Sequence, residues 1–263
     1  MAGLGVVKAQ LTVCHNRTVV SLRRSVHAVV LAAVVLTTGP AEAPAGAAPE
    51  LPAELPQAAR ARLQPVTDKA SLAVKVDGQS FVGRREVFEF LLDHPDFATH
   101  VTRALKFARY KIWRTPTGLG IDDGWGTVGT FEMVWTTAGH RVMYARGVYQ
   151  QRILPDIHGQ AVVAIDYGVQ PAGNGRSQIS TAVTGFVKLD SRLLAMASKM
   201  ASSVARAKGE KEAKSLVGLF AKTTQAIEAD PAGVFEKVRQ RPDTPARELE
   251  EFRRLLNLPA AAR

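Results

Sequence analysis

The sequence predicts an α+β protein in which a curved antiparallel β-sheet packs against a long C-terminal helical segment. The middle of the chain holds a series of short segments rich in β-branched and aromatic residues, which is typical of strands. The links between them are short and contain Gly, Asn, Asp or Pro, which favours hairpins over crossover connections. The apolar spacing then changes to three and four residues, which indicates helices.

The N-terminal residues 1–47 have the pattern of a secretory signal peptide. Arg23-Arg24 precedes an apolar core of about ten residues, and small residues follow, including Ala45-Gly46-Ala47, after which we expect cleavage. A membrane-spanning helix needs about 20 apolar residues, so this core is short for one, and an uncleaved anchor is the alternative. Cys14 is the single cysteine and lies before the core, so we reject lipidation and exclude an internal disulfide.

Residues 48–69 are rich in Pro, Ala and Gln. Six of the 14 prolines fall between Pro40 and Pro65. Because proline-rich segments favour extended, solvated backbone, the sequence predicts a linker here.

The folded part begins with a predicted strand at residues 71–76 and two short helices. Residues 84–93 and 95–105 each place apolar side chains on one helical face, and Pro95 suits a first helical position. Six predicted strands follow, with alternation of large side chains in Phe131-Glu-Met133-Val-Trp135 that implies one covered face. Their expected ranges are 107–115, 118–123, 127–137, 140–153, 160–170 and 178–189.

A long helix is predicted after Asp190. Its apolar stripe is interrupted by a polar stretch around Gly209 and resumes from Leu216 until Asp230-Pro231 ends it. Residues 231–263 read as a charged C-terminal extension with one further helix at 244–257.

The chain contains, in order, the segment Arg85-Glu-Val-Phe-Glu-Phe-Leu-Leu-Asp-His-Pro-Asp-Phe97, the strand series to Leu189, and the helix after Asp190. This order of elements resembles that of the START and birch-pollen-allergen-like superfamily (SRPBCC), which includes polyketide-cyclase-type domains and has the fold called helix-grip. The resemblance covers residues 70–230 as one domain. It implies a cavity between sheet and C-terminal helix that takes lipids, sterols or other apolar ligands, and some members are enzymes. The predicted break near Gly209 departs from the family's single closing helix.

Candidate pocket residues are the large aromatic and methionine side chains on the strands and closing helix, because ligand pockets are mostly apolar and methionine adapts to varied shapes. Ordinary core packing is the alternative for all of them. Arg146 would pair with a ligand carboxylate or phosphate if it points inward. The candidates are Trp113, Trp125, Phe131, Met133, Trp135, Tyr144, Arg146, Tyr149, Tyr167, Phe186, Met196 and Met200.

The sequence contains no strong motif for nucleotide binding, catalysis or metal binding. Residues 124–129 match G-x-G-x-x-G, but a strand rather than a helix follows, so the glycines fit a turn better than a nucleotide site. Asp156 and His158 place a carboxylate and an imidazole on one face of a strand, as a general acid–base pair or a capped turn would. The histidines are scattered without metal-ligand spacing, so we assign no catalytic residue, metal or cofactor.

The net charge of +10 is spread along the chain. Basic residues are interspersed with acidic ones and form no stripe or arm, so the sequence does not predict nucleic-acid binding, whereas contact with an anionic membrane surface stays open. The sequence therefore favours an exported, periplasmic or secreted protein that binds or transfers a hydrophobic ligand such as a lipid. The alternatives are a cyclase- or hydrolase-type enzyme on the same fold and an interaction module with a filled core.

Overall fold

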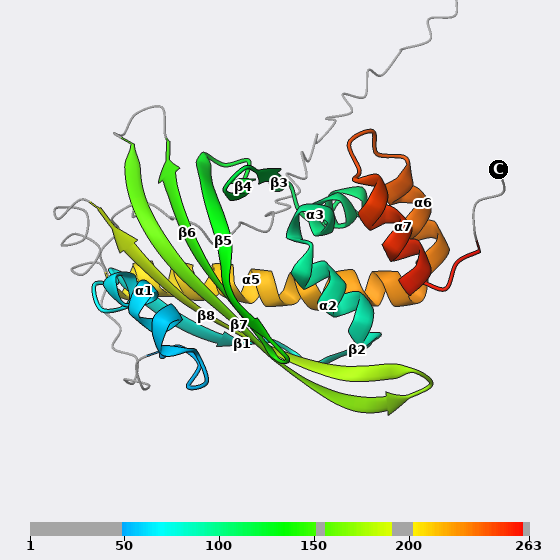
Figure 1. Ribbon diagram of the computed structural model, residues 1–263, viewed down its shortest axis with the longest axis horizontal. Coiled ribbons are helices and arrows are strands. Elements are labelled where there is room, and N and C mark those ends of the chain that lie inside the picture. Colours follow the sequence, from blue (N-terminus) through cyan, green and yellow to red (C-terminus); the bar gives the residue numbers. More distant parts are fainter. Residues whose placement is uncertain (1–48, 151–155, 191–201, 260–263) are drawn as a thin grey trace, which may run out of the picture.

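The computed structural model describes residues 49–150, 156–190 and 202–259. The predicted leader, Cys14 and the cleavage site lie outside the described residues. The centre of the molecule is one 8-stranded sheet with the strand order β1-β8-β7-β6-β5-β4-β3, and β2 also pairs with β8 (Figure 1). The strands are β1 Leu72–Asp77, β2 Phe81–Gly83, β3 Lys111–Thr115, β4 Gly118–Asp122, β5 Thr127–Thr137, β6 His140–Tyr149, β7 Ile157–Gly173 and β8 Arg176–Leu189.

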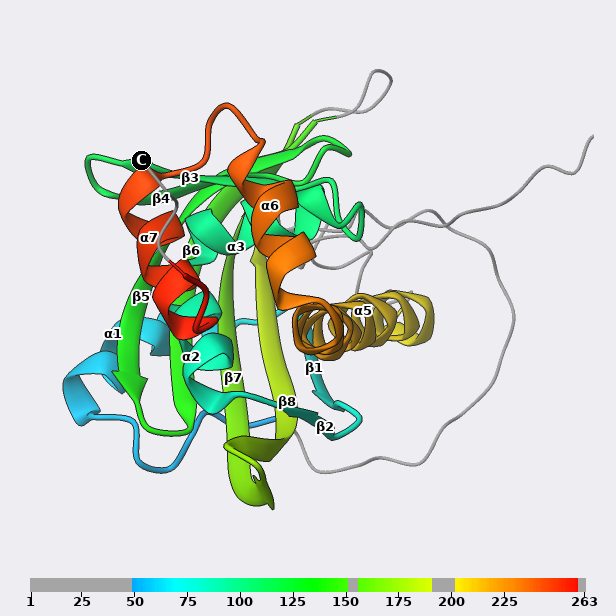
Figure 2. The same cartoon turned by 90° about the vertical axis from the view of Figure 1, so that its right-hand side faces the viewer.

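The sheet is an antiparallel meander from β3 to β8, as the turn residues predict. Each of these strands pairs with the next one along the chain, and β1 then pairs with β8, so the first and last strands are neighbours. The short β2 was not predicted. With most of its helices on one face of this curved sheet, the protein has the predicted α+β, helix-grip architecture (Figure 2).

Three helices, α2 (Arg85–Asp93), α3 (Pro95–Ala104) and α5 (Ser202–Ala229), cover the inner face of the sheet. Aromatic rings join them to the strands. The ring of Phe88 on α2 lies 5.6 Å from Phe81, 5.3 Å from Tyr167 and 6.1 Å from Phe220, in edge-to-face arrangements. Such pairs add a modest stabilisation to the burial of their apolar area.

The predicted break in the C-terminal helix is wrong. Helix α5 runs through Gly209 without interruption. A Cβ atom on Gly209 would lie 2.9 Å from Leu72 Cδ2 and 3.1 Å from Val74 Cγ1. The glycine therefore allows close contact with β1 rather than a bend. Leu193, Met196 and Met200, from the first part of the predicted stripe, lie outside the described residues.

The segment predicted to be an extended linker contains helix α1 (Gln57–Thr67). Leu63 and Val66 are fully buried on the outer face of the sheet, in a cluster with Val142 and Val162. The physical reason is the helical spacing of Ala59, Leu63 and Val66, which proline content had obscured.

The C-terminal extension forms two helices instead of the predicted one, α6 (Pro231–Arg239) and α7 (Ala246–Leu255). Phe252 is fully buried, with ring centroids 5.3 Å from Phe97 and 6.3 Å from Phe90. The residues beyond 230 therefore share a core with α2 and α3. In the described part of the chain, no helix is both long and apolar enough to cross a membrane.

We expect Gly209→Leu to lower the free energy of unfolding by about 1–3 kcal/mol, because the new side chain overpacks the contact with β1. The matched control is Gly218→Leu on the same helix, where a Cβ would meet no atom within 4 Å. That change should raise stability by roughly 0.5–1 kcal/mol through helix propensity alone. Urea denaturation measures both. Equal effects of the two substitutions would contradict close seating of α5 on β1.

Candidate functional site

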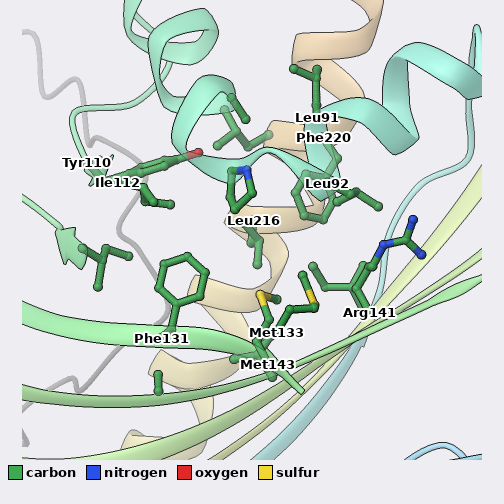
Figure 3. A pocket seen from close by; sticks show the side chains of 17 residues that line it. Leu91, Leu92, Tyr110, Ile112, Phe131, Met133, Arg141, Met143, Leu216 and Phe220 are labelled. Carbon is green, nitrogen blue, oxygen red and sulfur yellow. The ribbon is translucent and has the colours of Figure 1, made fainter. Parts of the chain in front are cut away.

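A cavity of about 150 Å³ lies between the inner face of the sheet and helices α2, α3 and α5 (Figure 3). Its wall is almost entirely apolar. The sheet contributes Phe131, Met133 and Met143, among others, and the helices contribute Leu92, Leu216 and Phe220, among others.

Strand alternation explains why these side chains meet. Met133 on β5, Met143 on β6 and Val163 on β7 are register partners, so they point to the same face of the sheet. Phe131 and Ala145 form the neighbouring row. The cavity floor is therefore fixed by register across adjacent strands.

Arg141 is the charged residue in the described wall, and its guanidinium is engaged within the protein. Nε donates to Asp93 Oδ1 at 2.6 Å and Nη2 donates to Asp93 Oδ2 at 3.0 Å. Nη1 donates to the carbonyl oxygens of Thr137 at 2.7 Å and His140 at 2.9 Å. Figure 3 shows the guanidinium directed away from Phe131 and Met133. The aliphatic part of the Arg141 side chain thus lines the cavity, while its guanidinium links β6 to α2 through Asp93.

Tyr110, in the connection between α3 and β3, is the hydroxyl-bearing residue in the described wall. Burial raises the pKa of the Tyr110 hydroxyl, and a hydrogen bond with Thr102 opposes the rise only in part. The hydroxyl is therefore protonated at neutral pH and carries no charge into the cavity.

The structure brings some predicted pocket residues to this cavity and places others elsewhere. Phe131 and Met133 line it. Tyr167 lies beside it in the aromatic cluster, and its hydroxyl donates to Glu89 Oε1 at 2.7 Å and accepts from Arg141 Nη1 at 3.3 Å. Met196 and Met200 lie outside the described residues.

The other predicted pocket residues do not line the cavity. Trp135, Tyr144 and Phe186 point to the outer face of the sheet, where they join the cluster under α1. Arg146 lies beside Tyr144 on that face, so it does not point inward, which was the condition for pairing with a ligand in the cavity. Strand register decides this, because a shift of one residue moves a side chain to the opposite face. Trp113 and Trp125 are 43% and 41% exposed, and Tyr149, partly buried, pairs with Thr127 near the end of the sheet.

Sequence reasoning missed several wall residues, notably Arg141, Met143 and Leu216. Met143 alternates with Arg141 and Ala145, but an arginine in this row hid the apolar pattern. Met143 could have been found from its position in the strand, which places it on the same face as Arg141 and Ala145, rather than from its residue type.

Asp156 and His158 lie on the opposite side of the sheet from the cavity. Both are exposed and flank the buried Ile157, and Asp156 Oδ2 accepts from Gln150 Nε2 at 3.2 Å. The closest imidazole–carboxylate contact on this outer face is instead between His140 Nδ1 and Asp166 Oδ1, at 2.7 Å.

The glycine motif forms the turn between β4 and β5. The carboxylate of Asp123 accepts from the backbone N–H groups of Trp125 at 2.6 Å and Thr127 at 2.9 Å, and Gly126 has a φ of +109°. These features describe a tight hairpin. Within residues 49–150, 156–190 and 202–259, no group of three or more His, Cys, Asp or Glu residues could hold a metal ion.

Comparison with known proteins gives no family assignment. No family model matches the sequence, and no curated protein matches it. Solved structures with some likeness include a conserved protein from Geobacillus kaustophilus, with 16% identity and a TM-score of 0.39 over 60% of this chain and 96% of that one. A hypothetical protein from Helicobacter pylori, jhp0584, has 13% identity and a TM-score of 0.38 over 72% and 99%.

A third likeness is norcoclaurine synthase from Thalictrum flavum in complex with dopamine and hydroxybenzaldehyde. It has 12% identity and a TM-score of 0.34 over 62% of this chain and 91% of that one.

Replacing Arg141 by Leu should lower the free energy of unfolding by about 2 kcal/mol, because Asp93 and two backbone carbonyls lose their donor. This loss is modest because the Asp93 side chain is 40% exposed and solvent screens its pair with Arg141. The control is Arg239→Leu, which breaks an exposed pair with Glu236 on α6 and should leave the urea midpoint unchanged. If Arg141→Leu lowered the free energy of unfolding no more than Arg239→Leu does, the ion pair between Arg141 of β6 and Asp93 of α2 would not be stabilising.

Proposed function

We propose that this protein is an exported carrier that binds an apolar ligand, such as the hydrocarbon part of a lipid, in the cavity between sheet and helices. The observation that carries the proposal is the apolar wall of the cavity of about 150 Å³. A cavity lined by aliphatic and aromatic side chains offers water few hydrogen-bond partners, so an apolar occupant is favoured over water.

The volume limits what enters. Pockets for whole drug-sized ligands have roughly 300–1,000 Å³, so an aromatic ring or the end of an aliphatic chain fits as the cavity stands. Met133 and Met143 lie side by side on β5 and β6, and their flexible side chains would let the cavity enlarge around a longer chain.

The polar groups of the wall support binding rather than catalysis. Arg141 is neutralised by Asp93, and Tyr110 is protonated at neutral pH. Asp156 and His158, the candidates for an enzyme of cyclase or hydrolase type, lie on the other side of the sheet. An interaction module with a filled core fits the open cavity less well.

The ligand proposal is tested on purified protein. We expect solvent extraction followed by mass spectrometry to recover an apolar molecule, and a fluorescent fatty acid to bind. Ala98→Phe projects a ring into the cavity from α3 and should weaken fatty-acid binding by about tenfold or more. The control Ala207→Phe makes the same change on the exposed face of α5. Equal fatty-acid binding by both variants, or no uptake by the wild type, would refute the proposal.

The export proposal is supported by the N-terminal pattern of Arg23-Arg24, an apolar core and Ala45-Gly46-Ala47. Expressed with its leader in a secreting host, the protein should leave the cytoplasm and begin at Ala48. Intact-mass measurement on separated cell fractions checks both points. Full-length protein in the cytoplasm would refute export, and full-length protein in the membrane fraction would indicate an uncleaved anchor.

A further inference from the structure

The connection from α3 to β3 carries unbalanced positive charge. Residues 103–114 include five Lys or Arg and no Asp or Glu. Lys106, Arg109 and Lys111 are exposed. The same segment supplies Tyr110 and Ile112 to the cavity wall. A basic surface therefore adjoins the site where the ligand is proposed to bind.

No neighbouring carboxylate in the described part of the chain neutralises these three cations. In the ranges that the structure describes, Lys106, Arg109 and Lys111 form no ion pair with a carboxylate. Arg114, at the end of the same segment, is paired with Asp96 at 2.8 Å and Glu248 at 3.1 Å. Ion pairs also involve Arg84, Arg85, Arg141, Arg176 and Arg253.

Aromatic rings lie among these cations. The guanidinium of Arg109 lies 5.4 Å from the ring centroid of the exposed Trp125, and Lys222 Nζ of α5 lies 4.0 Å from that of Phe107. We call Lys106, Arg109, Lys111 and Lys222, with Phe107 and Trp125, the basic–aromatic surface. The neighbouring Asp122 and Asp123 accept backbone N–H groups of their own turn, at 2.7 Å from Gly124 and 2.6 Å from Trp125, and leave the net charge positive.

Lys106 is held in a backbone conformation that favours glycine. It follows α3 with a φ of +57°. Its N–H donates to Arg103 O at 3.0 Å and the N–H of Phe107 donates to Thr102 O at 2.8 Å, which is the Schellman motif that usually has glycine at this position. The other non-glycine residues with positive φ in the described ranges are Asn174 and Asn257, a type that tolerates this region. The lysine at this strained backbone position points to a function of its side chain.

We propose that the basic–aromatic surface docks on an anionic lipid surface. The proposal rests on the proposed apolar ligand, since docking would bring the adjoining cavity to the lipid. Lys and Arg side chains are attracted to anionic head groups, and Trp favours the membrane interface. Lys106, Arg109, Lys111 and Lys222 meet the first requirement, and Trp125 meets the second.

The test is co-sedimentation with vesicles. The full mature chain should bind vesicles of equal parts phosphatidylcholine and phosphatidylglycerol, and not vesicles of phosphatidylcholine alone. Raising the salt from 0.1 M to 1 M, which shortens the Debye length from about 10 Å to about 3 Å, should release it. Lys106→Gln/Lys111→Gln should weaken binding by about tenfold or more.

The matched control is Lys69→Gln/Lys75→Gln, which removes the same charge from exposed positions away from this surface. Lys75 lies on β1, at the opposite edge of the sheet from β3. The control should bind anionic vesicles like the wild type. Equal losses in the two double variants would overturn the proposal, as would binding that does not require phosphatidylglycerol. Tighter binding to duplex DNA than to anionic vesicles at the same salt would also overturn it.

Lys106→Gly separates a functional role from a structural one. It should raise Tm by a few degrees, because glycine adopts positive φ without strain, and yet weaken vesicle binding. Unchanged vesicle binding by this variant would overturn the role of Lys106. Fatty-acid uptake from solution should stay normal in Lys106→Gln/Lys111→Gln and be lost in Ala98→Phe, so failure of docking is distinguishable from failure of the cavity.

Discussion

The close seating of helix α5 on the β1–β2 edge is the contact on which the rest of the structure depends. Gly209 meets the side chains of Leu72 and Val74, Gly78 lies against Val217, and Gly83 lies against Thr224. Because glycines occupy these contact points, the helix approaches the edge along much of its length. Its Leu216, Leu219 and Phe220 then reach the cavity, which is the space left between a tightly held helix and the middle of the curved sheet.

Ion pairs and hydrogen bonds of arginine side chains link the helices around the cavity, and the charged groups themselves lie outside it. Arg141 joins β6 to α2 through Asp93, and the guanidinium of Arg84 donates to Glu228 of α5 at 3.0 Å and to the carbonyl of Leu255 in α7 at 3.1 Å. Such pairs orient the elements, while burial supplies most of the stability. In the α3–β3 connection, by contrast, cations are exposed to solvent and lie beside exposed aromatic rings.

The sheet is covered on both faces, and this divides the large side chains between two environments. The inner face receives Phe131, Met133 and Met143 at the cavity, whereas the outer face buries Trp135, Tyr144 and Phe186 with α1. An apolar ligand and an apolar core require the same residue types. Whether a large apolar side chain lines the cavity or packs in the core under α1 therefore depends on the face of the sheet on which it lies.

The sequence by itself determined the fold class, the order of the six meander strands and the two short helices before them, because hydrophobic period and turn chemistry are local properties. It also identified Phe131 and Met133, which lie in one alternating strand. Tertiary structure alone decided the continuity of α5 at Gly209, the docking of α1, the burial of Phe252 and the engagement of Arg141 with Asp93. These features depend on contacts between residues far apart in the chain, and neither composition nor spacing records which distant surface a side chain will meet.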